Sequence, residues 1–146
     1  MRIYLDACCL NRPFDDQTID RNHLEAEAVL AILGHIGAGE WQFIGSEVLD
    51  REIEANPDID KREATRDLLQ IADMKIEVGV VEADRAQELK RMGLPELDAF
   101  HVACAESGKC DVLLTTDDVL QKRYNRVRRR IAVRIENPLK WLTEQM

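Results

Sequence analysis

The sequence predicts an α/β fold of three layers, in which helices cover both faces of a central parallel sheet of four to five strands. Short apolar segments at residues 3–5, 41–44 and 112–114 have the length of buried strands. Longer segments between them carry apolar residues at helical spacing. Strands that alternate with helices in this way form parallel sheets, because a parallel connection has to cross one face of the sheet.

The first half of the chain contains two of the expected strands. Residues 3–5 form a strand that Asp6 closes, and residues 11–16 form a loop. A helix follows from a cap at Asp20 to about residue 36, where a Gly-Ala-Gly segment ends it. Residues 41–44 form the second strand, and Gly45 and Ser46 lead into a helix. That helix ends before Pro57, because a residue that precedes proline disfavours the helical conformation.

The second half continues the alternation. Asp58 begins a helix that reaches about Met74, and residues 75–78 form a third strand. Residues 82–92 are helical, with Gly93 suited to the C-terminal cap, and Pro95 fits the first turn of a helix over residues 96–107. Residues 112–114 form the fourth strand, and residues 115–117 turn into another helix. A fifth strand at residues 131–135 and a last helix near residue 139 complete the expected fold.

Size and composition predict one domain over residues 1–146 and exclude some classes of protein. A net charge of −8 argues against a protein that coats nucleic acid, which is usually basic. A nuclease remains compatible, because it concentrates acidic residues at its metal site. The four cysteines form no C-x-x-C pair, so reduced thiols packed in the core are expected. Without a signal peptide or a membrane span, the expected location is the cytoplasm, with no membrane contact.

Two aspartates follow apolar strands, at the edge of an α/β sheet where ligands bind. Asp6 follows the first strand, and Asp117 follows the fourth. Asp117 could equally be the N-cap of the next helix. That alternative is weaker for Asp6, because no helical pattern begins beside it. These two carboxylates are therefore expected at the same edge of the sheet.

Two further carboxylates lie among apolar residues of expected helices. Glu52 shares a helix face with Val48 and Leu49, although a salt bridge at the border of that face would also explain it. Asp98 belongs to a helix that is apolar on nearly all sides, so a deeply buried carboxylate is expected there. A buried carboxylate requires a cation or several hydrogen-bond donors. His101 lies one turn further on and could bond to the carboxylate, ligate metal or contact substrate, or simply pack in the core.

Four acids that converge without basic neighbours repel one another, and a divalent cation relieves the repulsion. Oxygen ligands favour Mg²⁺ or Mn²⁺ over zinc, which prefers nitrogen and sulfur. A metal held by carboxylates suits hydrolysis of phosphodiester bonds, because it orients a water, lowers its pKa and stabilises the leaving oxygen.

Four segments of the chain resemble the PIN domain, the fold of many VapC-type toxin ribonucleases. They are the sequences IYLD at residues 3–6, SEVLDREI at 46–53, DAFHVACA at 98–105 and LLTTDD at 113–118. The resemblance implies a parallel sheet wrapped by helices and an acidic quartet that binds Mg²⁺ or Mn²⁺ for RNA cleavage. Matched position by position, the metal-binding and catalytic quartet is Asp6, Glu52, Asp98 and Asp117. Thr115 matches a hydroxyl position beside the last acid.

The chain departs from the family at Ala7, where a polar residue often follows the first aspartate. Asn11 and Arg12 could supply polar groups at the mouth of the site instead. We therefore expect Asn11, Arg12, Thr115 and His101 to contact substrate. The segment over residues 8–14 resembles a subset of small bacterial PIN proteins.

The leading hypothesis is a metal-dependent endoribonuclease, the toxin of a type II toxin–antitoxin pair, with RNA as substrate and an antitoxin as partner. The alternative is a PIN-like domain that binds RNA or protein with little or no cleavage, which Ala7 favours. A phosphoryl-transfer enzyme of another α/β family is disfavoured, because the chain has no P-loop and no G-x-G-x-x-G motif. A basic stretch over residues 122–134 is a solvated surface, a phosphate contact or a docking site for an acidic antitoxin segment. The RNA target, the number of metals, the identity of the antitoxin and a homodimer are left open.

Overall fold

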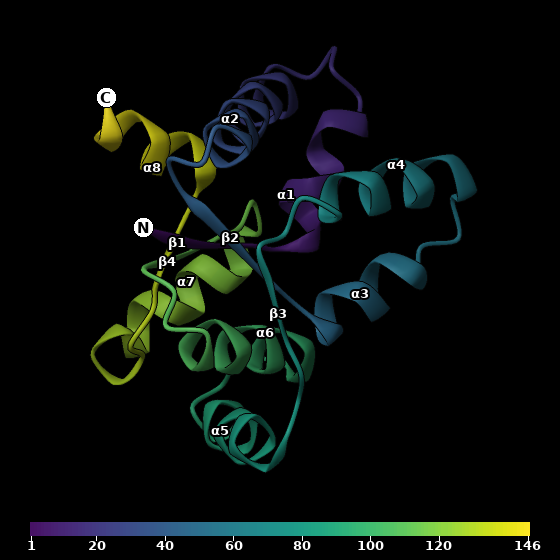
Figure 1. Ribbon diagram of the computed structural model, residues 1–146. Helices are drawn as coiled ribbons and strands as arrows, with labels where there is room; N and C mark the ends of the chain where they lie inside the picture. The colour runs from purple at the N-terminus through teal and green to yellow at the C-terminus, as the bar shows by residue number, and fades with distance from the viewer.

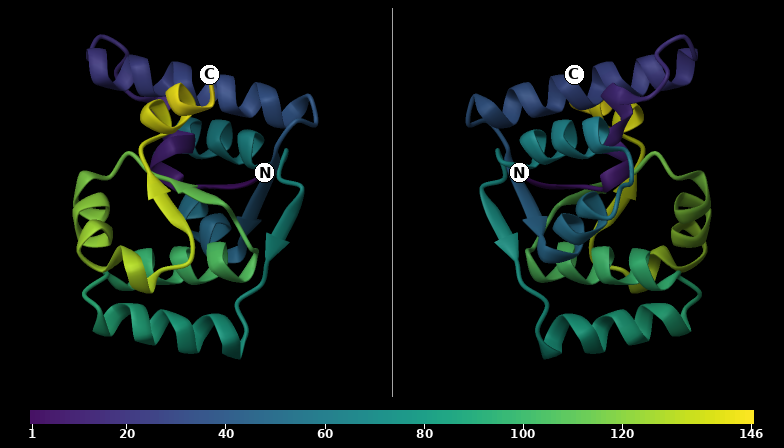
Figure 2. Two further views of the ribbon diagram at one scale, coloured as in Figure 1. Left: turned by 90° about the vertical axis from the view of Figure 1, so that its left-hand side faces the viewer. Right: turned by 90° about the vertical axis from the view of Figure 1, so that its right-hand side faces the viewer.

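The computed structural model describes residues 1–146 and contains one five-stranded sheet in the order β3-β2-β1-β4-β5. All four neighbouring pairs of strands are parallel. Helices lie on both sides of this sheet (Figures 1 and 2), which confirms the predicted three-layer α/β/α class. The strands are β1 (Arg2–Leu5), β2 (Gln42–Ser46), β3 (Met74–Ile76), β4 (Val112–Leu114) and β5 (Arg134–Glu136).

Eight α-helices connect and flank the strands. They are α1 (Ala7–Asn11), α2 (Asp20–Gly37), α3 (Glu47–Glu54), α4 (Ile59–Leu69), α5 (Val80–Arg91), α6 (Glu96–Ser107), α7 (Asp118–Val127) and α8 (Pro138–Gln145). Two short 3₁₀ segments, η1 (Arg12–Phe14) and η2 (Arg128–Arg130), follow α1 and α7. No helix is long and apolar enough to cross a membrane.

Two hydrophobic clusters lie on opposite faces of the sheet, and the strands alternate between them. In β1, Ile3 and Leu5 belong to the cluster that includes residues of α1, α2, α3 and α8, whereas Tyr4 belongs to the cluster of α5, α6 and α7. In β4, Leu114 and Leu113 divide in the same way. Neighbouring residues of a strand point to opposite faces, so strands buried on both sides read as the continuous apolar runs seen in the sequence.

The prediction of a loop over residues 11–16 was wrong for its first part. The chain forms the short helix α1 directly after Asp6, and η1 follows it. Ala7, Cys9 and Leu10 are buried in this turn. A helix of five residues shows too little of the 3.6-residue period to be recognised in a sequence. Asp6 is therefore the N-cap of a helix, contrary to the expectation that no helix begins beside it.

Several boundaries also differ from the prediction. Helix α4 ends at Leu69 and does not reach Met74, because Met74 pairs with Ile44 as the first residue of β3. Strand β2 extends to Ser46, and β5 begins only at Arg134. The predicted end of α5 is confirmed, since Gly93 directly after the cap has a φ of 106°, a conformation that glycine adopts without strain.

The pairing of β1 with β4 determines where the functional groups lie. Leu5 is aligned with Leu114, and the backbone N–H of Asp6 donates to the Leu114 carbonyl over 3.1 Å. The chain segments that leave β1 and β4 therefore start side by side, at the carboxyl edge of the sheet. This confirms that Asp6 and Asp117 follow strands that end at the same edge.

Candidate metal centre

Asp6 is the buried carboxylate at the bottom of the site. The backbone N–H of Ala7 donates to its Oδ1 over 2.7 Å, and the Thr115 hydroxyl donates to its Oδ2 over 3.1 Å. Burial raises the pKa of Asp6, although the charge of His101 and these two hydrogen bonds oppose the shift. Asp6 therefore has two hydrogen-bond donors although residue 7 is an alanine.

Glu52 projects from α3 toward the same point, where it contacts His101 of α6. Nε2 of His101 lies 2.6 Å from Oε2 of Glu52 and 3.9 Å from Oδ1 of Asp6. His101 is only 1% exposed, so it contacts these carboxylates from below. Burial by itself lowers the pKa of His101, but the hydrogen bond with Glu52 and the charge of Asp6 outweigh burial, and the pKa is raised. The only partner of Glu52 is thus a histidine inside the site, and no surface cation pairs with it.

A buried chain of polar groups fixes the orientation of His101. Its Nδ1 lies 2.6 Å from the hydroxyl of Tyr4, which in turn lies 2.6 Å from Oγ of Ser46. Tyr4 and Ser46 are both fully buried. Neither residue was among those predicted for the site. Tyr4 was the available signal, because a residue with a polar tip in a buried strand needs a hydrogen-bond partner.

Asp98 lies in the first turn of α6, close to the other acids. It is half-buried, and the deep burial expected for it begins only at Ala99. Burial is the largest cause that raises its pKa to about 6, and the charges of Asp6, Asp117 and Glu52 raise it further. These charges oppose the ionisation of Asp98, which is the direction expected for neighbouring acids.

Asp117 is exposed at the start of α7. Its Oδ1 accepts hydrogen bonds from the backbone N–H groups of Val119 over 2.9 Å and Leu120 over 3.3 Å. The helix-capping interpretation is therefore confirmed. The same carboxylate acts on the pKa of Asp98, so capping does not remove it from the acidic cluster. Because its second oxygen makes no hydrogen bond, Asp117 can both cap the helix and face a cation.

The four residues predicted to contact substrate differ in how they lie relative to the acids. Thr115 is buried between Asp6 and the backbone N–H of Asp117, which donates to its hydroxyl over 3.1 Å. Arg12 does not project freely into the site, because its guanidinium is paired with Asp15 and with Glu25, each over 3.0 Å. Asn11 is half-buried at the end of α1, and its Oδ1 has no hydrogen-bond partner. His101 is buried beneath the carboxylates.

The donor set fits a hard divalent cation. Asp6, Glu52 and His101 each offer a ligand atom, and these atoms lie within 4.8 Å of one another. Asp98 and Asp117 do not belong to this group of three, although the charges of Asp6, Glu52 and Asp117 act on the pKa of Asp98. No Lys or Arg side chain pairs with any of the four acids. Oxygen ligands in excess, with acids that repel one another, match the requirements of Mg²⁺ or Mn²⁺.

Comparisons with known proteins agree with this fold. The family model described as the PIN domain matches residues 3–126, and the chain therefore belongs to the PIN domain family. No curated protein sequence matches the chain.

Two solved structures are similar to it in fold. The crystal structure of FitAcB from Neisseria gonorrhoeae aligns with a TM-score of 0.62 and 14% identity, over 93% of this chain and 97% of the other. The structure of VapBC2 from Rickettsia felis, bound to a DNA fragment from their promoter, aligns with a TM-score of 0.60 and 14% identity, over 94% of this chain and 98% of the other.

Proposed function

We propose that the protein is an endoribonuclease that uses Mg²⁺ or Mn²⁺ to hydrolyse phosphodiester bonds of RNA. The observation that carries this proposal is the group formed by Asp6, Glu52 and His101, whose ligand atoms lie within 4.8 Å of one another. Burial, together with the charges of Asp6, Asp117 and Glu52, raises the pKa of Asp98 to about 6, which is consistent with further acids near this group. Such a cluster is costly for folding unless a cation neutralises it. Membership of the PIN domain family supports nuclease activity.

Each residue has a distinct part in the proposed site. Asp6, held by Ala7 and Thr115, is the fixed buried ligand, and Glu52 and Asp98 complete the site from two helices. His101 orients Glu52 through a bond that Tyr4 and Ser46 support from below. Asp117 adds negative charge at the mouth. When bound, the cation would activate a water and stabilise charge on the leaving oxygen.

We further propose that the protein is the toxin of a type II pair and that an antitoxin protein holds it inactive. The similarity in fold to the FitAcB and VapBC2 structures supports this partner. A cytoplasmic location and a single domain over residues 1–146 belong to the same proposal. A PIN-like domain that binds RNA without cleavage is the competing function. Ala7 favoured it, but Thr115 supplies the hydroxyl contact to Asp6 that Ala7 lacks.

Cleavage of a mixed RNA pool tests the proposal. Wild-type protein is incubated with the pool in Mg²⁺, in Mn²⁺ and in EDTA, next to Asp98→Asn and the control variant Asp84→Asn. Asp84 is an exposed residue of α5 without a side-chain partner, so its variant removes the same charge away from the site. We expect metal-dependent cleavage by wild type and Asp84→Asn, and its loss in Asp98→Asn. Equal cleavage by Asp98→Asn, or cleavage that persists in EDTA, would contradict the proposal.

A further inference from the structure

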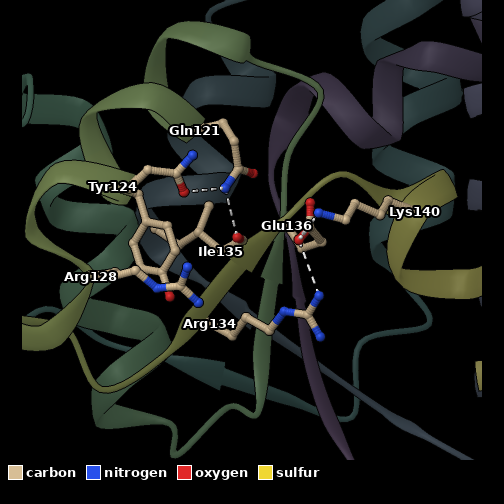
Figure 3. A pocket seen from close by; sticks show the side chains of 8 residues that line it. Gln121, Tyr124, Arg128, Arg134, Ile135, Glu136 and Lys140 are labelled. Carbon is tan, nitrogen blue, oxygen red and sulfur yellow. Dashed lines mark hydrogen bonds and ion pairs between the residues drawn. The ribbon is translucent and has the colours of Figure 1, made fainter. Parts of the chain in front are cut away.

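A polar groove lies at the edge of the sheet, between α7 on one side and β5 with the start of α8 on the other (Figure 3). We refer to it as the α7–β5 groove. Its volume is about 260 Å³. The lining residues are Gln121, Tyr124, Asn125, Arg128, Arg134, Ile135, Glu136 and Lys140. A second hollow formed by residues 125–130 continues it and shares Asn125 and Arg128 with it.

The groove opens onto a cluster of arginines that have no ionic partner. Within the basic stretch, Arg123 donates to the Gly93 carbonyl over 2.7 Å, and Arg134 pairs with Glu144 over 2.8 Å. Four other arginines make no ion pair and no side-chain hydrogen bond: Arg126, Arg128, Arg129 and Arg130. The chain carries 28 acidic and 20 basic residues, so partners are abundant elsewhere. A free basic cluster on an acidic protein indicates a surface that binds an anion from outside the chain.

The one carboxylate in the groove does not cancel this charge. Oε2 of Glu136 lies 3.1 Å from Arg134 and 3.4 Å from Lys140, so two cations already neutralise it. Figure 3 shows Glu136 between these two side chains, while Arg128 lies at the other end of the groove next to Tyr124. The free positive charge is therefore at the Arg128 end.

The groove begins near the metal centre and leads away from it. Helix α7 starts directly after Asp117, and Gln121, Asn125 and Arg128 follow on one face of that helix. The eleven residues from Asp117 to Arg128 span roughly 16 Å at about 1.5 Å per residue. Strand β5 forms the other wall, with Glu136 aligned with Leu114, the last residue of β4. One helix face thus connects an acid of the site with the free arginines.

The walls between these ends carry neutral hydrogen-bonding groups. Nε2 of Gln121 donates to the Ile135 carbonyl over 3.0 Å, and its buried Oε1 has no partner. Tyr124 is almost fully buried, and its hydroxyl makes no hydrogen bond within the chain. Cations and neutral hydrogen-bonding groups are the side chains that contact the phosphates and sugars of a nucleic-acid strand.

We propose that the α7–β5 groove binds the RNA strand on one side of the cleaved bond, with Arg128, Arg129 and their neighbours in contact with its phosphates. This inference rests on the proposed ribonuclease function. A span of roughly 16 Å corresponds to about five stacked nucleotides at about 3.4 Å each. An acidic protein segment would also meet the arginines. RNA is favoured because the first lining residue, Gln121, lies one helical turn beyond Asp117, and a strand held at the metal centre has to continue beyond it.

Binding of a labelled 12-nucleotide single-stranded RNA in EDTA tests the inference, since no cleavage occurs there. Wild type is compared with the double variant Arg128→Gln/Arg129→Gln at several salt concentrations. Each lost phosphate contact on a single strand changes the slope of log K against log [salt] by about 0.7. We therefore expect the double variant to bind more weakly and its slope to be less steep by about 1.4.

The matched control is Arg91→Gln/Lys109→Gln, which removes the same charge from two exposed side chains that make no ion pair and line neither hollow. It should keep the wild-type slope. An unchanged slope in the groove variant, or an equal change in both variants, would overturn the inference. The inference would also be overturned if binding of a poly-glutamate peptide required Arg128 and Arg129 while binding of the RNA did not. The groove would then bind an acidic protein segment.

Failure of this inference can be told apart from failure of the proposed function. With Mn²⁺ present, the groove variant should raise KM for the 12-nucleotide RNA and leave kcat unchanged, because its arginines lie away from the metal centre. If wild type cleaves no RNA but the groove variant still loses the salt slope, the groove binds RNA and the nuclease proposal fails. If wild type cleaves and the groove variant matches it in KM and slope, the nuclease proposal stands and the groove inference fails.

Discussion

Replacing Asp98 with Asn should stabilise the metal-free protein while abolishing its metal-dependent activity. The substitution keeps the shape of the side chain and removes one charge from the cluster. Because the pKa of Asp98 is about 6 in the folded state, against 3.8 as its ordinary value, the folded state binds this proton more tightly than the unfolded chain does. Protonation of Asp98 therefore stabilises the folded state below about pH 4, and this stabilisation is lost as the pH rises to about 6.

The size of the effect follows from the shift. At 1.36 kcal/mol per pKa unit, the shift from 3.8 to about 6 corresponds to about 3 kcal/mol. Asp98 is half-buried, and solvent screening lowers the expected gain to about 1–3 kcal/mol at pH 7.5. For a chain of this size, about 1 kcal/mol moves the melting temperature by roughly 3 °C. Asp98→Asn in EDTA should therefore melt about 3–9 °C above wild type.

The assay is thermal unfolding followed by circular dichroism in EDTA at pH 4 and pH 7.5. The gain should be present at pH 7.5 and nearly absent at pH 4, where Asp98 is protonated. Asp84→Asn, which removes an exposed charge without a partner, should change the melting temperature little at either pH. A clearly destabilised Asp98→Asn protein at pH 7.5 would refute the reasoning, because Asp98 would then be a structural residue in a favourable ion pair.

Three further predictions follow from the same structure. Mn²⁺ at a hundredfold excess over its Kd should raise the free energy of unfolding of wild type by about 2.7 kcal/mol. At a fixed Mn²⁺ concentration this stabilisation should grow between pH 5 and pH 7, because Asp98 loses its proton in that range. Calorimetry in EDTA and in Mn²⁺ would measure the difference, and an equal gain in Asp98→Asn would argue against the site. Gly108→Ala should destabilise the fold by about 1–3 kcal/mol, because its Cβ would lie 2.9 Å from a side-chain carbon of Ile44. Gly34→Ala has open space around the new Cβ and should stabilise α2 by about 0.5–1 kcal/mol. Denaturant titration of both variants separates the effect of packing from that of helix propensity. Glu25 is buried and pairs with Arg12 and Arg21, so Glu25→Ala should lower the free energy of unfolding by about 3 kcal/mol in the same titration. An unchanged free energy of unfolding in Glu25→Ala would show that these ion pairs add no stability.

The strands and the long helices could be predicted because their signals are local. Continuous apolar runs indicate strands buried on both faces, and the structure divides Ile3, Tyr4 and Leu5 between two cores as that pattern requires. Helix α1 could not be predicted, since five residues carry no visible period. The end of α4 was placed too late because Met74 fits both a helix and the edge strand that pairing with Ile44 selects.

The site could be predicted in part. Carboxylates that follow strands meet at one edge by the rules of parallel sheets, so the positions of Asp6 and Asp117 follow from topology. The hydrogen bonds from Ser46 through Tyr4 and His101 to Glu52 depend on side chains from four elements. No local pattern encodes such a contact. The pairing of Arg12 with Glu25 is a contact of the same kind, and it removes from the mouth of the site a cation that the sequence placed there.

The metal centre can be tested most directly by locating manganese, through its anomalous scattering, in crystals of the protein soaked with Mn²⁺. We expect one or more peaks within the reach of Asp6, Glu52 and Asp98, with direct metal–oxygen distances of about 2.0–2.2 Å. The same crystals of Asp98→Asn should show weaker occupancy. Manganese bound elsewhere on the chain, with none between these carboxylates, would contradict the claim that they form a metal centre.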